Sequence, residues 1–304
     1  MASNKAKIGV ALFILLALIP LYLFFHQSGA KKSVVGEHAE QPKESEASVE
    51  KSAESGVPAK ISVTTGKEVE QVEAKEMPDT TGTPGLEPKK VVPNSFLVVI
   101  DPGHQEQANL GKEPVGPGGS ETKIKVTGGT SGVATGKPEY KLTLEASLIL
   151  GELLESKGIK VIYTRTTHTV NLSNRERAEI ANQNHADLFI RIHADGSTDR
   201  NVRGLSVLTP AKNSPYTKTI FEDSLKASQL IIDETNKNPA LKVNGISYRG
   251  DMTGFNWSKV PCTLVEMGFM TNPVEDKNLS DTVYLKKLLN NVADGILDYV
   301  SYKE

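Results

Sequence analysis

Short apolar runs alternate with amphipathic segments from residue 95 to the end of this 304-residue chain. The runs expected to form strands lie at 95–100, 159–164, 187–192, 204–210 and 260–266. The segments expected to form helices lie at 138–158, 174–185, 214–236 and 282–302. Strands that alternate with helices of this length indicate an α/β fold, in which helices pack against a sheet.

The ends of two expected helices carry their own signals. Pro138 suits the first turn of the helix 138–158, and Gly158 suits its end. Ser173 and Glu176 have the spacing of a capping box, which predicts that the next helix begins at this point. We therefore treat residues 94–304 as one folded domain.

Residues 1–30 have the pattern of a targeting segment. Lys5 and Lys7 precede 18 residues, from Ile8 to Phe25, without a charged side chain, which is long enough to span a bilayer. We expect a retained signal anchor that leaves the rest of the chain outside the cytoplasm. A small-residue site at Ser28 and Ala30 keeps a cleaved signal peptide, and hence a secreted protein, as the alternative.

Residues 31–93 have the composition of a disordered linker. The segment contains no aromatic residue and is rich in Glu, Lys, Ser, Val and Pro. Such a chain cannot bury enough apolar surface to offset its conformational entropy. The formal net charge of −2 for the whole chain predicts no nucleic-acid partner, and we expect a monomer tethered to the membrane.

Three ionisable residues follow or end predicted strands. His104 comes just after the first strand, His193 directly after the run 187–192, and Glu266 ends the run 260–266. In open α/β sheets, binding sites form outside the carboxyl ends of the strands. The coincidence of three such endings, more than any single residue, predicts that the three side chains share a site.

The residue types of this predicted site suit a hydrolytic zinc centre. Two imidazoles and one carboxylate leave the fourth position of zinc open for water, and a further carboxylate must take the proton of that water. His104 and His193 are then ligands and Glu266 is the base. The pattern leaves the third ligand open between Glu121, Glu139 and Glu145, which all lie between the two histidines.

Four motif blocks resemble the zinc-dependent N-acetylmuramoyl-L-alanine amidases of the Amidase_3 type. The blocks are "VVIDPGH" (98–104), "PEYKLTLEASLILGELLESKGIKVIYTR" (138–165), "NRERAEIANQNHADLFIRIHAD" (174–195) and "CTLVEMGFMTNPVED" (262–276). They occur in the family's order, and the resemblance extends over essentially all of 95–300.

This resemblance implies both a fold and an activity. It implies a twisted, six-stranded mixed sheet flanked by helices. It also implies that His104, Glu139 and His193 bind Zn²⁺ and that Glu266 is the catalytic carboxylate. The expected reaction is cleavage of peptidoglycan at the amide between N-acetylmuramic acid and L-alanine, outside the cytoplasm. A zinc peptidase that cuts within the stem peptide and an inactive wall-binding or activator protein are the alternatives.

The third block departs from the family pattern at two positions. The family commonly has Ser-Ile-His-Ala-Asn where this chain has Arg191-Ile192-His193-Ala194-Asp195. On a strand, Arg191 projects to the same face as His193. We expect a structural ion pair between Arg191 and Asp195, with contact to substrate as the alternative.

The remaining chemical groups are expected to be structural. His168 lies in a loop, His185 at a helix end, and Cys262 on the last strand, where it is expected to be a small buried hydrophobe. A single cysteine also excludes an internal disulfide. The polar, Gly-rich segment 105–137 is too long for a simple connection, which suggests a functional loop.

Overall fold

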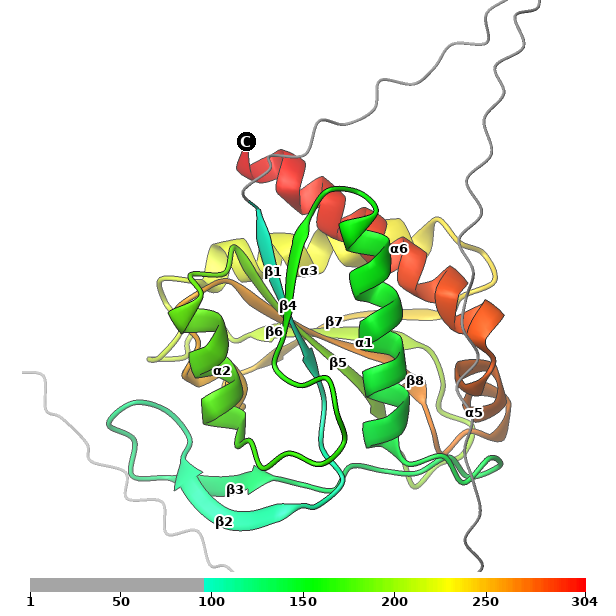
Figure 1. The fold of residues 1–304 in the computed structure, drawn as a ribbon, viewed down its shortest axis with the longest axis horizontal. Coiled ribbons are helices and arrows are strands. Elements are labelled where there is room, and N and C mark those ends of the chain that lie inside the picture. Colours follow the sequence, from blue (N-terminus) through cyan, green and yellow to red (C-terminus); the bar gives the residue numbers. More distant parts are fainter. Residues whose placement is uncertain (1–95) are drawn as a thin grey trace, which may run out of the picture. The chain divides into compact units, whose positions relative to one another are not determined.

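The structure is a computed structural model that describes residues 96–304 (Figure 1). In chain order its elements are β1 (Leu97–Pro102), β2 (Asn109–Pro114), β3 (Thr122–Val126), α1 (Glu139–Glu155), β4 (Lys160–Tyr163), α2 (Asn174–Gln183), β5 (Leu188–Asp195), β6 (Leu205–Pro210), α3 (Phe221–Asn236), β7 (Val243–Arg249), α4 (Thr253–Asn256), β8 (Cys262–Phe269), α5 (Pro273–Ser280) and α6 (Thr282–Lys303). The predicted signal anchor and linker lie outside these residues. Within 96–304, no helix is both long enough and apolar enough to cross a bilayer.

Six strands form one mixed sheet in the order β4-β1-β5-β8-β6-β7. Strands β4, β1, β5 and β8 run parallel to one another, whereas β6 pairs antiparallel with β8 and parallel with β7. The six-stranded mixed sheet that the resemblance implied is therefore confirmed.

Apolar side chains on both faces of the sheet make two cores. Val98 and Ile100 of β1 face a core that includes side chains of α1, α3 and α6. Val99, between them in the sequence, faces a second core with Ala178 of α2 and Phe255 of α4. This alternation follows from the two-residue period of a strand, and it explains why the parallel strands read as continuous apolar runs.

Helix α2 begins where the capping box predicted. The Ser173 side chain accepts a hydrogen bond from the Glu176 backbone N–H at 3.2 Å, and the Glu176 carboxylate accepts one from the Ser173 N–H at 2.8 Å. The two bonds satisfy two backbone donors that the helix cannot pair internally. The capping box is therefore confirmed.

Several boundaries differ from the sequence expectation. Helix α3 begins at Phe221, whereas the apolar spacing predicted a start at 214. Strands β5 and β8 extend to Asp195 and Phe269, so His193 and Glu266 lie inside strands instead of directly at their ends. The segment 105–137 contains the two-stranded sheet β2–β3, which the sequence did not predict.

Candidate metal centre

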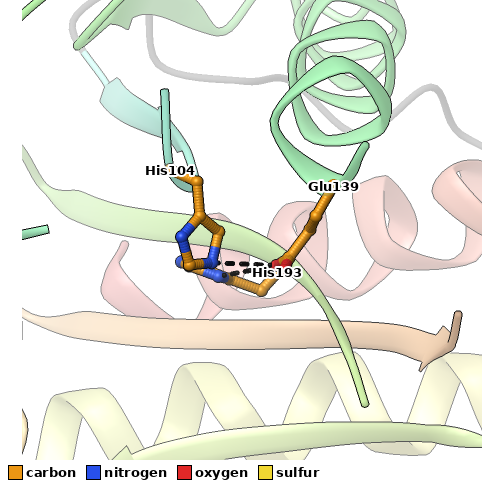
Figure 2. A group of neighbouring side chains, drawn as sticks. All are labelled: His104, Glu139 and His193. Carbon is orange, nitrogen blue, oxygen red and sulfur yellow. Dashed lines mark hydrogen bonds and ion pairs between the residues drawn. The ribbon is translucent and has the colours of Figure 1, made fainter. Parts of the chain in front are cut away.

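Three side chains point towards one another near the carboxyl ends of β1 and β5: His104, Glu139 and His193 (Figure 2). His104 follows β1, Glu139 is the first residue of α1, and His193 lies in β5. Glu139 Oε1 lies 3.1 Å from His104 Nε2 and 3.2 Å from His193 Nδ1. One donor atom from each of the three side chains lies within 4.8 Å of the others, so the three form a cluster that could hold a metal ion.

The backbone around His104 is bent so that its ring turns towards the cluster. His104 has a φ of 58°, which is uncommon for a residue with a side chain. Two arginines fix the carbonyl groups of this bend. Arg177 Nη2 donates to His104 O at 2.9 Å, and Arg165 Nη2 donates to Gly103 O at 2.9 Å. The cost of the unusual φ is thus offset by charge-assisted hydrogen bonds.

A buried carboxylate holds one of these arginines and also Arg191. Asp101 Oδ1 pairs with Arg177 Nη1 at 2.8 Å, and Asp101 Oδ2 pairs with Arg191 Nε at 2.8 Å. Burial raises the pKa of Asp101, but the two arginine charges outweigh it and hold that pKa below its usual range. The expected pairing of Arg191 with Asp195 is wrong, because Asp101 is the residue opposite Arg191 in the β1–β5 register.

Glu139 is fixed by backbone donors as well as by the histidines. Its Oε2 accepts from the Thr130 N–H at 2.8 Å, and its Oε1 accepts from the Ala194 N–H at 3.2 Å. Burial raises the pKa of Glu139, but hydrogen bonds and charges from both histidines outweigh it, so the net shift is downwards. Its place in the first turn of α1 also favours a negative charge.

The other two acids considered for the third ligand do not join the cluster. Glu145 lies further along α1 and forms an ion pair with Lys137, which precedes the helix. Glu121 is exposed and lies at the rim of a groove beside the site. Among the three acids, only Glu139 belongs to the cluster with both histidines.

The two imidazoles are held in forms that suit metal binding. His104 Nδ1 lies 2.9 Å from Thr127 O, and a carbonyl there keeps the proton on Nδ1 and leaves Nε2 as a lone-pair donor. Burial lowers the pKa of His193 to about 4, so its ring is neutral at physiological pH. His193 Nε2 is buried without a hydrogen-bond partner. The atoms that face one another are His104 Nε2, His193 Nδ1 and Glu139 Oε1, and this set of two imidazole nitrogens and one carboxylate fits a zinc ion.

Glu266 lies beside the cluster on the neighbouring strand. It pairs with His193 in the β5–β8 register, so both side chains project to the same face. Its Oε2 is buried without a hydrogen-bond partner. Burial, followed by the charges of Glu139 and Asp195, raises the pKa of Glu266 well above its usual range. An unpartnered carboxyl group with a raised pKa is typical of a proton-transfer residue.

The other two histidines of residues 96–304 and the cysteine lie outside the cluster. The His168 ring packs edge-on against Tyr140 with centroids 5.3 Å apart. His185 follows α2 with a φ of 51°. Cys262 is buried, and burial raises the pKa of its thiol to about 12, which keeps it unreactive.

Gly103 leaves the space that the His193 ring occupies. A Cβ atom at this position would lie 2.4 Å from His193 Cε1 and 2.5 Å from His193 Nε2. We expect Gly103→Ala to displace the ring and to weaken zinc binding by about 10-fold or more, measured by competition with a chromogenic chelator. Gly128→Ala is the matched control, because nothing lies within 4 Å of a Cβ there. Equal zinc affinity in the two variants would show that Gly103 does not set the position of His193.

Fold and site together define the class of the protein. The α/β fold carries a His-Glu-His cluster near the carboxyl ends of inner strands of its mixed sheet. The carboxyl group of Glu266, which has an unpartnered oxygen, lies beside this cluster. These are the parts of a metal-dependent hydrolase. The sequence model of the N-acetylmuramoyl-L-alanine amidases (Amidase_3) matches residues 98–298, and the chain belongs to this family.

Individual relatives agree with this assignment. The chain is 28% identical over 215 residues to the N-acetylmuramoyl-L-alanine amidase Rv3717 of Mycobacterium tuberculosis, covering 68% of this chain and 87% of that one. It is 28% identical over 263 residues to the amidase AmiA of Salmonella typhimurium, and this match covers 74% of this chain and 84% of AmiA. The crystal structure of the amidase Ami1 from Mycobacterium smegmatis superposes with a TM-score of 0.62 at 25% identity. The superposition covers 68% of this chain and 98% of Ami1. The expected family and enzyme class are therefore confirmed.

Proposed function

We propose that the protein hydrolyses the amide bond between N-acetylmuramic acid and the L-alanine of the stem peptide, with a zinc ion held by His104, Glu139 and His193. The observation that carries the proposal is the convergence of both imidazoles on Glu139 Oε1, at 3.1 and 3.2 Å, in a chain of this amidase family. Nothing else in the described region combines two histidines and a carboxylate at this range.

Zinc fits the donor set better than Mg²⁺ or Ca²⁺ does. Two imidazole nitrogens and one carboxylate are typical of catalytic zinc, whereas Mg²⁺ and Ca²⁺ prefer oxygen ligands throughout. A bound zinc ion supplies an activated water and polarises the carbonyl group of the substrate. Thr127 O and the Thr130 N–H orient His104 and Glu139 for this task.

Glu266 is the residue that we assign to proton transfer. Its Oε2 accepts the proton of the attacking water and returns it to the nitrogen of the leaving stem peptide. This role requires a carboxyl group that is free of other partners and close to the bound metal. The unpartnered Oε2 and the position opposite His193 support it.

The N-terminal residues complete the proposal. The apolar run from Ile8 to Phe25 supports a membrane anchor, with residues 31–93 as the tether and 94–304 as the catalytic domain. The enzyme then acts, as a monomer, on the cell wall outside the membrane. Relatives in Staphylococcus aureus are named probable cell wall amidases, which supports this location; the chain spans 58% of their length.

Mass spectrometry of the products tests the proposed bond. Purified peptidoglycan digested with the protein should yield intact glycan strands without peptide and free stem peptides whose first residue is L-alanine. Shortened stem peptides still attached to the glycan would identify a peptidase instead. No released product, from a protein that binds zinc and peptidoglycan, would identify a wall-binding protein without activity.

A further inference from the structure

Two grooves with largely different walls adjoin the metal centre. The first has a volume of about 640 Å³ and the second about 470 Å³. Both are lined by His104, His193 and Glu266, so both open onto the same reacting centre. A substrate whose scissile bond lies at this centre can therefore place one half in each groove.

The two grooves differ in their charged side chains. Every cation on their walls lies in the first groove, which we call the basic groove: Lys112, Lys123, Arg191 and Arg249. No lysine or arginine lines the second groove, and its only charged groups are carboxylates, including Asp195. Four hydroxyl side chains line it, and we call it the hydroxyl groove: Thr130, Ser197, Thr198 and Thr271. The basic groove also has hydroxyl groups beside its cations, from Thr122, Thr127 and Thr253.

The cations of the basic groove are not fully neutralised by its acids. Asp251 is shared between two of them, with 2.7 Å to Lys123 Nζ and 2.8 Å to Arg249 Nε. Lys112 is exposed and has no ion pair with any residue from 96 to 304. Against Lys112, Lys123 and Arg249 the walls of this groove offer Asp251 and Glu121, and its third carboxylate, Glu266, lies at the reacting centre that both grooves share. An anionic ligand therefore gains favourable electrostatic contacts here, whereas the only charged side chains in the hydroxyl groove are carboxylates, which repel it.

We infer that the basic groove binds the stem peptide through its carboxylates and that the hydroxyl groove binds the glycan strand. The inference rests on the proposed function, because it divides that substrate between the two grooves. A stem peptide carries a C-terminal carboxylate and, where it is not amidated, the carboxylate of its glutamate. The glycan side offers mainly hydroxyl and acetamido groups, which hydrogen-bond to threonine and serine hydroxyls.

A charge-removal variant with paired substrates tests the inference. The variant is the full-length Lys112→Gln/Lys123→Gln double mutant, whose two positions lie on the exposed β2–β3 hairpin. The substrates are two soluble muramoyl-peptides that differ only in whether the carboxylates of the stem are free or amidated. For the free-acid substrate we expect KM to rise about fivefold with little change in kcat, because two partly exposed charge contacts are lost. For the amidated substrate we expect KM to change less than about twofold, since it offers no carboxylate to these lysines.

Controls separate this inference from the proposed function. Lys287→Gln removes an exposed lysine on α6 that lines neither groove, and it should leave both KM values unchanged. Equal changes for the two substrates, or none, in an active double mutant overturn the inference and leave the proposed function intact. Failure of the wild-type protein to cleave either substrate overturns the proposed function itself. Salt should also reduce the preference of the wild type for the free acid, because exposed charge contacts are screened.

Discussion

Replacing Glu266 by glutamine is expected to lower kcat for peptidoglycan hydrolysis by about 10²- to 10⁴-fold, which is the usual contribution of a positioned proton-transfer group. The zinc content should stay at that of the wild type, because Glu266 is not among the three residues that hold the ion. Glutamine keeps the size of the side chain but cannot accept the proton of the attacking water. Zinc analysis of the purified variant and the initial rate of peptide release are the two measurements.

The comparison with Glu222→Gln separates catalysis from a general charge effect. Glu222 is an exposed carboxylate on α3 that lines neither groove, so its amide should leave both activity and zinc unchanged. A Glu266→Gln protein with near-normal kcat would show that another group moves the proton. Loss of zinc in the same variant would show instead that Glu266 contributes to holding the metal.

Replacing Glu139 by alanine is expected to abolish activity by removing the metal. The variant loses the carboxylate that faces both histidines, at 3.1 and 3.2 Å, so zinc affinity should fall by at least about 100-fold. Glu145→Ala, six residues further along α1, is the matched control. It loses only a partly exposed ion pair with Lys137, worth less than about 1 kcal/mol, and should keep zinc and activity.

The two glutamate variants also decide between readings that the sequence alone left open. Zinc affinity measured by competition with a chelator should fall in the Glu139 variant and remain unchanged in the Glu145 variant. The reverse order would mean that the side chains at the start of α1 rearrange when the ion binds. Wild-type zinc affinity in both variants would exclude the carboxylates of Glu139 and Glu145 from the metal centre.

The sequence predicted most of the site because apolar runs are easy to recognise, even though the strands themselves extend further. His104, His193 and Glu266 lie at or just beyond the ends of such runs, where a parallel sheet brings side chains together. The choice of Glu139 depended on the family resemblance. Its physical basis lies in contacts between distant segments, since the N–H groups of Thr130 and Ala194 fix its carboxylate in place. A helix pattern cannot reveal such donors.

Other features were not predictable from patterns because pairing with distant residues decides them. Strand β7 is an edge strand with several exposed residues and an internal Gly245, so it has no clean apolar alternation. The two-residue period of a strand predicted the side of the sheet to which Arg191 projects. It did not predict that Arg191 pairs with Asp101. Asp101 lies opposite Arg191 only because β1 and β5 pair in that register.

A zinc titration of the metal-free protein tests the central claim most directly. The full chain is stripped with a chelator, and the rate of peptide release from peptidoglycan is measured as zinc is added back. We expect no activity without zinc, and a linear rise that reaches its plateau at one zinc ion per chain, because His104, Glu139 and His193 form a single site. Full activity in the stripped protein would contradict a metal centre at these three residues.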